Sequence, residues 1–313
     1  MNVFKALWKS CRFVLATPRL LAILWITLLL TAAPLGLMMQ REIASDIGAS
    51  RVHLDLRERM DMVWLGEFGD RGGFLGRTLK PVTASGADFL GNLDLLFSGR
   101  LFTESPGLVS VGIGYALVWL LILGGVIDRF ARGGGKVILS QFLAAAGRYF
   151  PRLLALTAVS ATGYWGVYWL AEKGFTAIEA ATRDVTVEAT VLKYYLLAAI
   201  PVLLLTAIVM MISDYARIAA VVEERSAWTA LGRGARFVVQ RPLQVFGLAL
   251  IVTLAALAIV ALRTVATPGV GESSLLGILG VFLIGQLFVA SRLALRLIRI
   301  GSQLSLYRAL RRS

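Results

Sequence analysis

Two short pairings of an acid with an arginine are the strongest candidates for chemistry in this sequence. Asp128 is followed four residues later by Arg132, and Asp214 is followed three residues later by Arg217. On a helix these spacings put both side chains on one face. Each pair can form a gate or a partner-binding site, or can simply fix a helix end as an interfacial ion pair. We favour the ion pair, and exposed pairs of this kind contribute under about 1 kcal/mol.

Two later arginines, Arg292 and Arg296, follow an apolar stretch that has no acid at its end. Long basic side chains near the end of a membrane span can extend to the lipid headgroups. We therefore expect these arginines either to reach the headgroups or to pair with Asp128 and Asp214.

No ionisable residue falls near the middle of an apolar stretch, so the candidates for a polar cavity are neutral. They are Thr157, Ser160, Thr206 and Gln286. Such groups more often hydrogen-bond between helices than bind a substrate. We favour that structural interpretation and keep the cavity as the alternative.

Metal and redox chemistry have few residues to use here. The chain has one histidine, His53, and one cysteine, Cys11. A zinc site of Cys and His ligands and an internal disulfide are both excluded. We expect no metal, no cofactor and no catalytic residue, and hence no enzyme. Cys11 lies on the apolar stripe of a predicted helix, where it can pack or be palmitoylated.

The elements that position these residues are membrane spans. Of the 313 residues, 58% are hydrophobic, and mean hydropathy is +0.76. The apolar residues fall in blocks of about 20, which is the length that crosses a bilayer core as a helix. The sequence predicts an all-α polytopic membrane protein, with one transmembrane domain over residues 1–313. The predicted spans are 20–39, 107–127, 153–171, 191–213, 243–262 and 275–297.

The connections between spans differ in charge. One side of the membrane receives both termini and 20 of the 32 basic residues, with a formal balance of +16 against −3 on the other side. The positive-inside rule then predicts cytoplasmic termini, and the style of the composition suggests a bacterial cell inner membrane. Residues 40–106 form an extracytoplasmic loop or cap. The basic face is explained by topology and anionic headgroups, so no nucleic acid partner is needed.

Part of the sequence repeats. Residues 4–18 align without a gap on residues 228–242, with six identities that include Arg12 with Arg236 and Pro18 with Pro242. A weaker third copy ends at Pro151. Each copy precedes a span and has the pattern of a basic amphipathic helix lying in the headgroup plane. We therefore expect three repeated helical hairpins, with cytoplasmic interfacial helices that include residues 137–150 and 226–241.

The predicted inner-face segments are DYARIAAVVEERSAWTALGRGARFVVQRP and DRFARGGG followed by FLAAAGRYFPR. With the spans around them they resemble a family of uncharacterised six-span bacterial membrane proteins, similar to the membrane domain of glycerophosphodiester phosphodiesterases. The resemblance implies a membrane component close to lipid metabolism. It does not extend to the metal-binding carboxylates of the soluble phosphodiesterase domain, so it implies no catalysis.

Three functions fit these features. The first is a non-catalytic scaffold, accessory or membrane-organising component that contacts the lipid bilayer, its anionic headgroups and a membrane protein partner. The second is a transporter or channel subunit for a neutral or lipid-like solute, because repeats and span prolines are common in transporters. The third, an intramembrane enzyme, lacks an aspartate pair, a buried histidine or a metal cluster. We favour the first.

Overall fold

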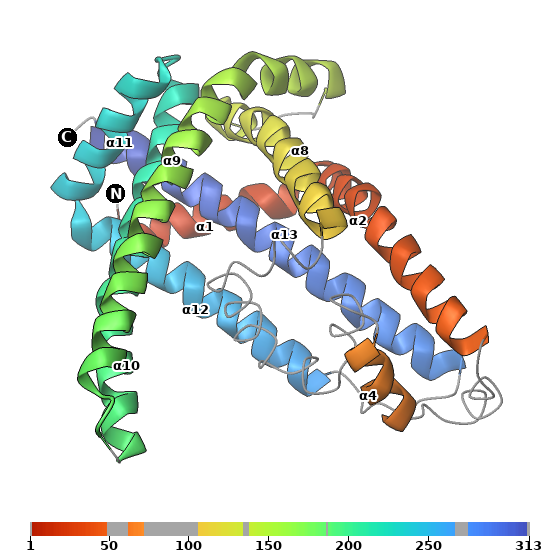
Figure 1. The fold of residues 1–313 in the computed structure, drawn as a ribbon. Coiled ribbons are helices and arrows are strands. Elements are labelled where there is room, and N and C mark those ends of the chain that lie inside the picture. Colours follow the sequence, from red (N-terminus) through yellow and green to blue (C-terminus); the bar gives the residue numbers. More distant parts are fainter. Residues whose placement is uncertain are drawn as a thin grey trace. The chain divides into compact units, whose positions relative to one another are not determined.

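The structure is a computed structural model that describes residues 2–48, 62–71, 106–133, 138–185, 187–266 and 275–311. Within these ranges the regular structure is entirely helical (Figure 1). The helices are α1 (Val3–Ala16), α2 (Pro18–Gly48), α4 (Met62–Arg71), α8 (Pro106–Ala131), α9 (Leu139–Ala181), α10 (Glu188–Val222), α11 (Ala227–Gln240), α12 (Pro242–Ala266) and α13 (Leu275–Arg311). His53 and most of the predicted 40–106 cap lie outside the described residues.

Six helices in the described part of the chain are long and apolar enough to cross a membrane. The candidate spans are Pro18–Gly48, Val109–Ala131, Leu139–Ala181, Ala189–Val222, Pro242–Ala266 and Leu279–Arg311. The protein is therefore an all-α multi-pass membrane protein, which confirms the predicted fold class.

The prolines have two different roles in these helices. Pro18 and Pro242 are the first residues of α2 and α12. Proline suits this position because the amide hydrogen that it lacks would have no partner inside the helix. Pro34, Pro151 and Pro201 lie within α2, α9 and α10 without ending them. Membrane helices tolerate internal prolines of this kind.

The expectation of a separate interfacial helix over residues 137–150 is wrong. The structure has one continuous helix, α9, that runs through Pro151 for 43 residues. At 1.5 Å per residue α9 is about 65 Å long, which is twice the thickness of a bilayer core. A single proline removes only one backbone hydrogen bond, and no turn residue lies beside it to end the helix. α13 likewise continues to Arg311, well beyond the predicted boundary at 297.

The chain divides into two compact units. The first unit comprises Met1–Phe13, Leu120–Leu250 and Ile298–Ser313, and the second comprises Val14–Trp119 and Ile251–Leu297. We call them the α9–α11 unit and the α2–α4 unit. The long helices α8, α12 and α13 each contribute residues to both.

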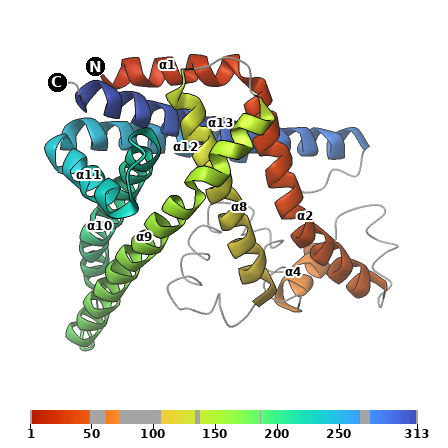
Figure 2. The ribbon, with the colours of Figure 1, turned by 90° about the horizontal axis from the view of Figure 1, so that it is seen from above.

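In the α9–α11 unit, α9 and α10 form a helical hairpin (Figures 1 and 2). The buried hydroxyl groups of Ser160 and Ser213 lie 2.7 Å apart across this hairpin. Nearby, a Cβ atom at Gly163 would lie 3.2 Å from the side chain of Val209. Small residues therefore let the two helices approach closely, as they do in many membrane helix pairs.

α11 lies still closer to α10. A Cβ atom placed on Gly234 would lie 2.6 Å from the backbone nitrogen of Ala216 and 2.8 Å from the carbonyl oxygen of Ile212. Backbone atoms cannot move aside as the end of a flexible side chain can. Glycine is therefore required at position 234 for the two backbones to pack at this distance.

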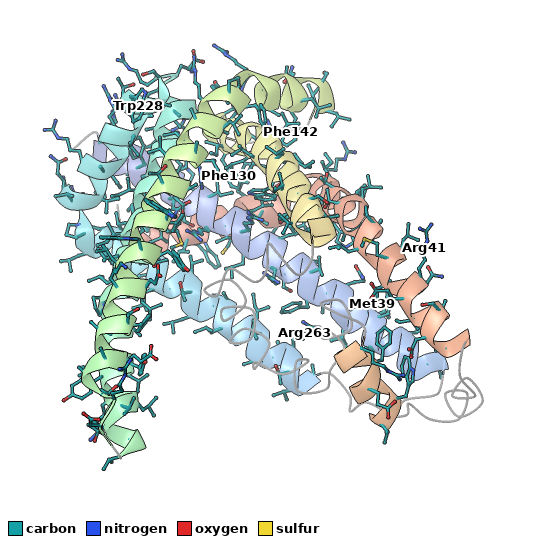
Figure 3. All side chains as sticks on the ribbon, in the orientation of Figure 1. Met39, Arg41, Phe130, Phe142, Trp228 and Arg263 are labelled. Atoms are coloured by element: carbon teal, nitrogen blue, oxygen red, sulfur yellow. The ribbon has the colours of Figure 1, made fainter. Side chains whose placement is uncertain are left out.

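The N-terminal helix packs in the same unit. Figure 2 shows α1 beside the C-terminal turns of α13. At the contact, a Cβ atom on Gly301 would meet the ring of Phe130 and lie 2.9 Å from the hydroxyl oxygen of Ser10. The rings of Phe13 and Phe130 are 4.4 Å apart between centroids. Phe130, labelled in Figure 3, thus joins α8 to α1 and α13.

In the α2–α4 unit, α4 packs on the C-terminal part of α2. Trp64 and Phe68 are buried there, with Met39, Ile43 and Ile47 of α2 packed against them. The indole nitrogen of Trp64 donates to the carboxylate of Asp46 over 2.7 Å. This described fragment of the predicted cap is therefore held to a long helix by apolar burial and a polar contact.

Candidate functional site

The polar residues of the α9–α11 unit concentrate at the C-terminal end of α10. Asp214, in the last turns of this helix, forms a close ion pair with Arg299 of α13. Its carboxylate also accepts a hydrogen bond of 2.9 Å from the side-chain amide of Gln303. Arg217, the partner predicted from spacing, is farther away at 3.6 Å. Asp214 therefore links α10 to α13 more directly than it fixes its own helix.

Glu223, nine residues after Asp214, caps α10 and receives three donors. Arg233 of α11 forms a close ion pair with it, and Arg311 of α13 lies 2.9 Å away. The hydroxyl group of Tyr307 donates over 2.5 Å to Oε1, the same carboxylate oxygen that Arg311 contacts, whereas Arg233 contacts Oε2. Only 3% of the Glu223 side chain is exposed. A buried carboxylate needs such charge-assisted partners to offset its lost hydration.

The next residue contrasts with Glu223. Glu224 has a φ of +52°, which turns the chain out of α10 toward α11. Its side chain is 52% exposed and pairs with Arg148 of α9 at 2.9 Å. Of these two adjacent glutamates, the buried Glu223 pairs with arginines of α11 and α13, and the exposed Glu224 pairs with an arginine of α9.

Three aromatic rings pack beside the Glu223 cluster. The ring of Phe237 lies 4.7 Å from that of Tyr215 and 5.0 Å from that of Tyr307, measured between centroids. Tyr215 is only 1% exposed. The three rings come from α10, α11 and α13. They therefore form an apolar contact among the same three helices that Glu223 joins.

A pocket of about 660 Å³ lies on the arginine side of this cluster. We call it the arginine pocket, and its lining residues are Arg233, Arg236, Phe237, Gln240, Arg241, Tyr307, Leu310 and Arg311. All of them belong to α11, its C-terminal cap or the last turns of α13. Four arginines therefore line one hollow, and two of them, Arg233 and Arg311, form ion pairs with Glu223.

The first predicted pair, Asp128 with Arg132, forms an ion pair of 2.8 Å in the structure. The hydrogen bonding of Arg132 to the carboxylate of Asp128, together with the negative charge of that carboxylate, raises the pKa of Arg132 above its ordinary value. Arg132 is 60% exposed, so the pair has the character of an ion pair at a helix end.

The predicted arginines of α13 have aromatic neighbours in the α2–α4 unit. The guanidinium carbon of Arg296 lies 3.4 Å from the ring centroid of Trp119, and one of its nitrogens donates to the hydroxyl of Tyr115 over 3.0 Å. Arg292 lies 5.6 Å from the ring of Phe288. Figure 3 labels Arg263 of α12, which is 4.6 Å from the same ring. The α13 arginine that the structure places on Asp214 is Arg299, which sequence analysis did not select.

The side chains of the four candidate cavity residues form hydrogen bonds with groups of the helices. The hydroxyls of Thr157 and Thr206 donate to carbonyl oxygens one turn earlier in their own helices. Ser160 bonds across to Ser213, as described above. Gln286 accepts a hydrogen bond of 3.0 Å from the indole nitrogen of Trp25, joining α13 to α2. Ser160 and Gln286 therefore bond between helices, whereas Thr157 and Thr206 bond within their own helices.

Other potential sites can be compared with this cluster. Within the described residues, no group of three or more His, Cys, Asp or Glu side chains is placed to hold a metal ion. Comparisons of the chain with protein-family models, curated proteins and solved structures found no match. The two carboxylates and the arginine pocket are therefore the features of the described chain that bear on its function.

Proposed function

We propose that this chain is a non-catalytic membrane component, a scaffold or accessory subunit that contacts lipid and a membrane protein partner. The observation that carries the proposal is that both carboxylate oxygens of Glu223 already have partners within the protein, namely Arg233, Arg311 and Tyr307. A carboxylate held in this way fastens three helices together. Asp214 is held in a similar way by Arg299 and Gln303.

Two helices present apolar side chains that support contact with lipid. α1 buries Ala6 and Ser10 on one face, while Phe4 and Trp8 on another are both 68% exposed. α11 buries Phe237 and Val238, while Trp228, labelled in Figure 3, is 72% exposed. Exposed tryptophan beside arginine is typical of helices that lie at a membrane interface. We place both helices at the cytoplasmic face of an inner membrane, with cytoplasmic termini.

Native extraction tests the proposal. The full chain is expressed in a bacterial inner membrane, extracted directly into lipid nanodiscs and analysed by mass spectrometry. We expect a membrane protein to co-purify in a fixed ratio. Recovery of the chain without a partner in a fixed ratio would contradict the accessory role.

One observation favours the second candidate function, a transporter for a lipid-like solute. An apolar groove of about 530 Å³ lies between α2 and α8 in the α2–α4 unit. Its lining is almost entirely aliphatic, and Thr31 and Tyr115 supply its polar groups. Reconstitution of the purified chain into vesicles with a fluorescent phospholipid decides between the candidates. Movement of the probe across the bilayer at a rate proportional to the amount of protein would establish transport and remove the scaffold proposal.

A further inference from the structure

The arginine pocket has more positive charge than its own carboxylate can balance. Four arginines line it, and Glu223 is the acid that binds two of them. Arg236 and Arg241 form no ion pair with any residue in the described part of the chain. Like charges gathered around one hollow repel each other, so the arrangement favours an anion between them.

The arginines are also positioned in advance. Arg233 and Arg311 each contact Glu223 through Nη1, and their side chains remain 40% and 51% exposed. Because a guanidinium group has five N–H donors, most remain for a second acceptor. On α11, Arg233, Arg236 and Gln240 follow each other at intervals of three and four residues, which places them on one face. Arg241, the C-terminal cap of α11, lines the same pocket.

The shape and chemistry match a phosphate group. Guanidinium groups bind phosphate oxygens through two parallel hydrogen bonds, and arginine is preferred wherever this planar recognition is needed. A volume of about 660 Å³ lies within the range of small-molecule sites. The rings of Phe237 and Tyr307 supply an apolar side to the pocket, which suits the glycerol part of a headgroup better than a bare ion.

We propose that the arginine pocket is a specific site for a phosphate-bearing anion, with Arg236 and Arg241 as its principal ligands. This inference rests on the proposed lipid-contacting role and adds a defined ligand class to it. The same phosphate chemistry has two sources, an anionic phospholipid in the membrane or a soluble phosphate in the cytoplasm, and the test distinguishes them.

The experiment uses the full chain in phosphatidylcholine nanodiscs with increasing fractions of phosphatidylglycerol. Bound lipids are counted by native mass spectrometry. The pocket variant is Arg236→Gln with Arg241→Gln. The matched control is Arg12→Gln with Arg225→Gln, which removes the same charge from two exposed arginines of the same unit that do not line the pocket.

We expect the unaltered chain to retain phosphatidylglycerol in preference to phosphatidylcholine. The pocket variant should weaken this retention about tenfold or more, since each charge-assisted hydrogen bond lost corresponds to at least that factor. The control should change it by less than about threefold. Equal losses in both variants, or no preference in the unaltered chain, would overturn the inference. So would an acidic protein that co-purifies through Arg236 and Arg241 in place of lipid.

Competition with glycerol 3-phosphate and with inorganic phosphate identifies the source. If millimolar glycerol 3-phosphate displaces the lipid from the unaltered chain, and this effect is absent in the pocket variant, the site binds a soluble phosphate compound. Retention of lipid against both competitors would assign it to a membrane phospholipid. If the glutamine variant fails to fold, Arg236→Lys with Arg241→Lys keeps the charge and removes the paired hydrogen bonds, and we expect an intermediate loss. None of these measurements depends on a protein partner, so the pocket and the accessory role can fail separately.

Discussion

Tyr307 of α13 donates its hydroxyl hydrogen to Glu223 at the end of α10 over 2.5 Å, although the two residues are 84 positions apart. The same carboxylate binds Arg233 and Arg311. Three helices therefore depend on one side chain that is almost completely buried.

Replacement of Glu223 by Gln should destabilise the protein by about 2–3 kcal/mol. The change removes the charge that binds two arginines, while the half-exposed arginines recover part of the loss by hydration. Glu224→Gln is the matched control, because that side chain is 52% exposed and its loss should cost under about 1 kcal/mol. Thermal unfolding of both variants in detergent measures the difference. An equal loss of stability in the two variants would contradict the conclusion that Glu223 holds the three helices together.

Gly234→Ala should loosen the contact between α10 and α11. The added Cβ atom would lie 2.6 Å from a backbone nitrogen of α10, and overpacking of this kind costs about 1–3 kcal/mol. Gly232→Ala provides the comparison, since no atom lies within 4 Å of a Cβ placed there. That change should leave stability unchanged or raise it by up to about 1 kcal/mol through helix propensity. Melting temperatures in one detergent give both values, and a stabilised Gly234→Ala protein would refute the packing argument.

Ser160 and Ser213 should show a measurable coupling. Ser213 donates to the carbonyl oxygen of Val209, which leaves its oxygen free to accept from Ser160. A double-mutant cycle with alanine at each position should give a coupling of about 0.6 kcal/mol, with an upper limit near 1.7 kcal/mol, as for hydrogen bonds in other membrane proteins. Denaturant unfolding in mixed micelles measures the four proteins. A coupling of zero would mean that the hydroxyls serve only their own helices.

Gln286→Leu should cost about 1–2 kcal/mol, because the indole N–H of Trp25 then has no acceptor in an apolar environment. Adding Trp25→Phe removes the donor as well, so the double variant should recover most of the lost stability. Unfolding of the single and double variants tests this. If Gln286 served a solute instead, its replacement would alter transport in vesicles while Trp25→Phe gave no recovery.

The native cysteine offers a direct test of the predicted orientation. Cys11 is partly exposed on α1, and we expect an impermeant maleimide to label it in inside-out vesicles and not in right-side-out vesicles. The reciprocal probe is Asp184→Cys in a Cys11→Ser background, at an exposed position between α9 and α10. It should label from the opposite side. The reverse pattern would place the termini outside.

The spans and the two acid–arginine pairs could be predicted from sequence because they depend on local properties. Length and hydropathy alone locate a membrane helix, and the spacing of Asp128 and Arg132 is that of neighbours on a helix. The spacing of Asp214 and Arg217 predicted their ion pair of 3.6 Å, but it did not predict the closer partner of Asp214, which is Arg299. That partner is 85 residues away and has no local signal.

Glu223 was not selected for the same reason. Sequence analysis counted it as one more cytoplasmic acid, and nothing in its neighbours separates it from Glu224. Burial of one and exposure of the other follow from the turn after α10 and from the approach of α13. The continuity of α9 through Pro151 was not predicted either, because proline is favoured at the first position of a helix and disfavoured in its interior.

The three donors of Glu223 also become available at different times while the chain is being made. Arg233 lies only 10 residues after the glutamate, so that pair can form as soon as α11 leaves the ribosome. Tyr307 and Arg311 lie in the last turns of the sixth candidate span, so they reach the carboxylate only after nearly all of that span has been synthesised. Completion of the cluster is therefore a late event in biogenesis. A chain that has not finished inserting its last helices would leave Glu223 with Arg233 alone, and membrane quality control could recognise that difference.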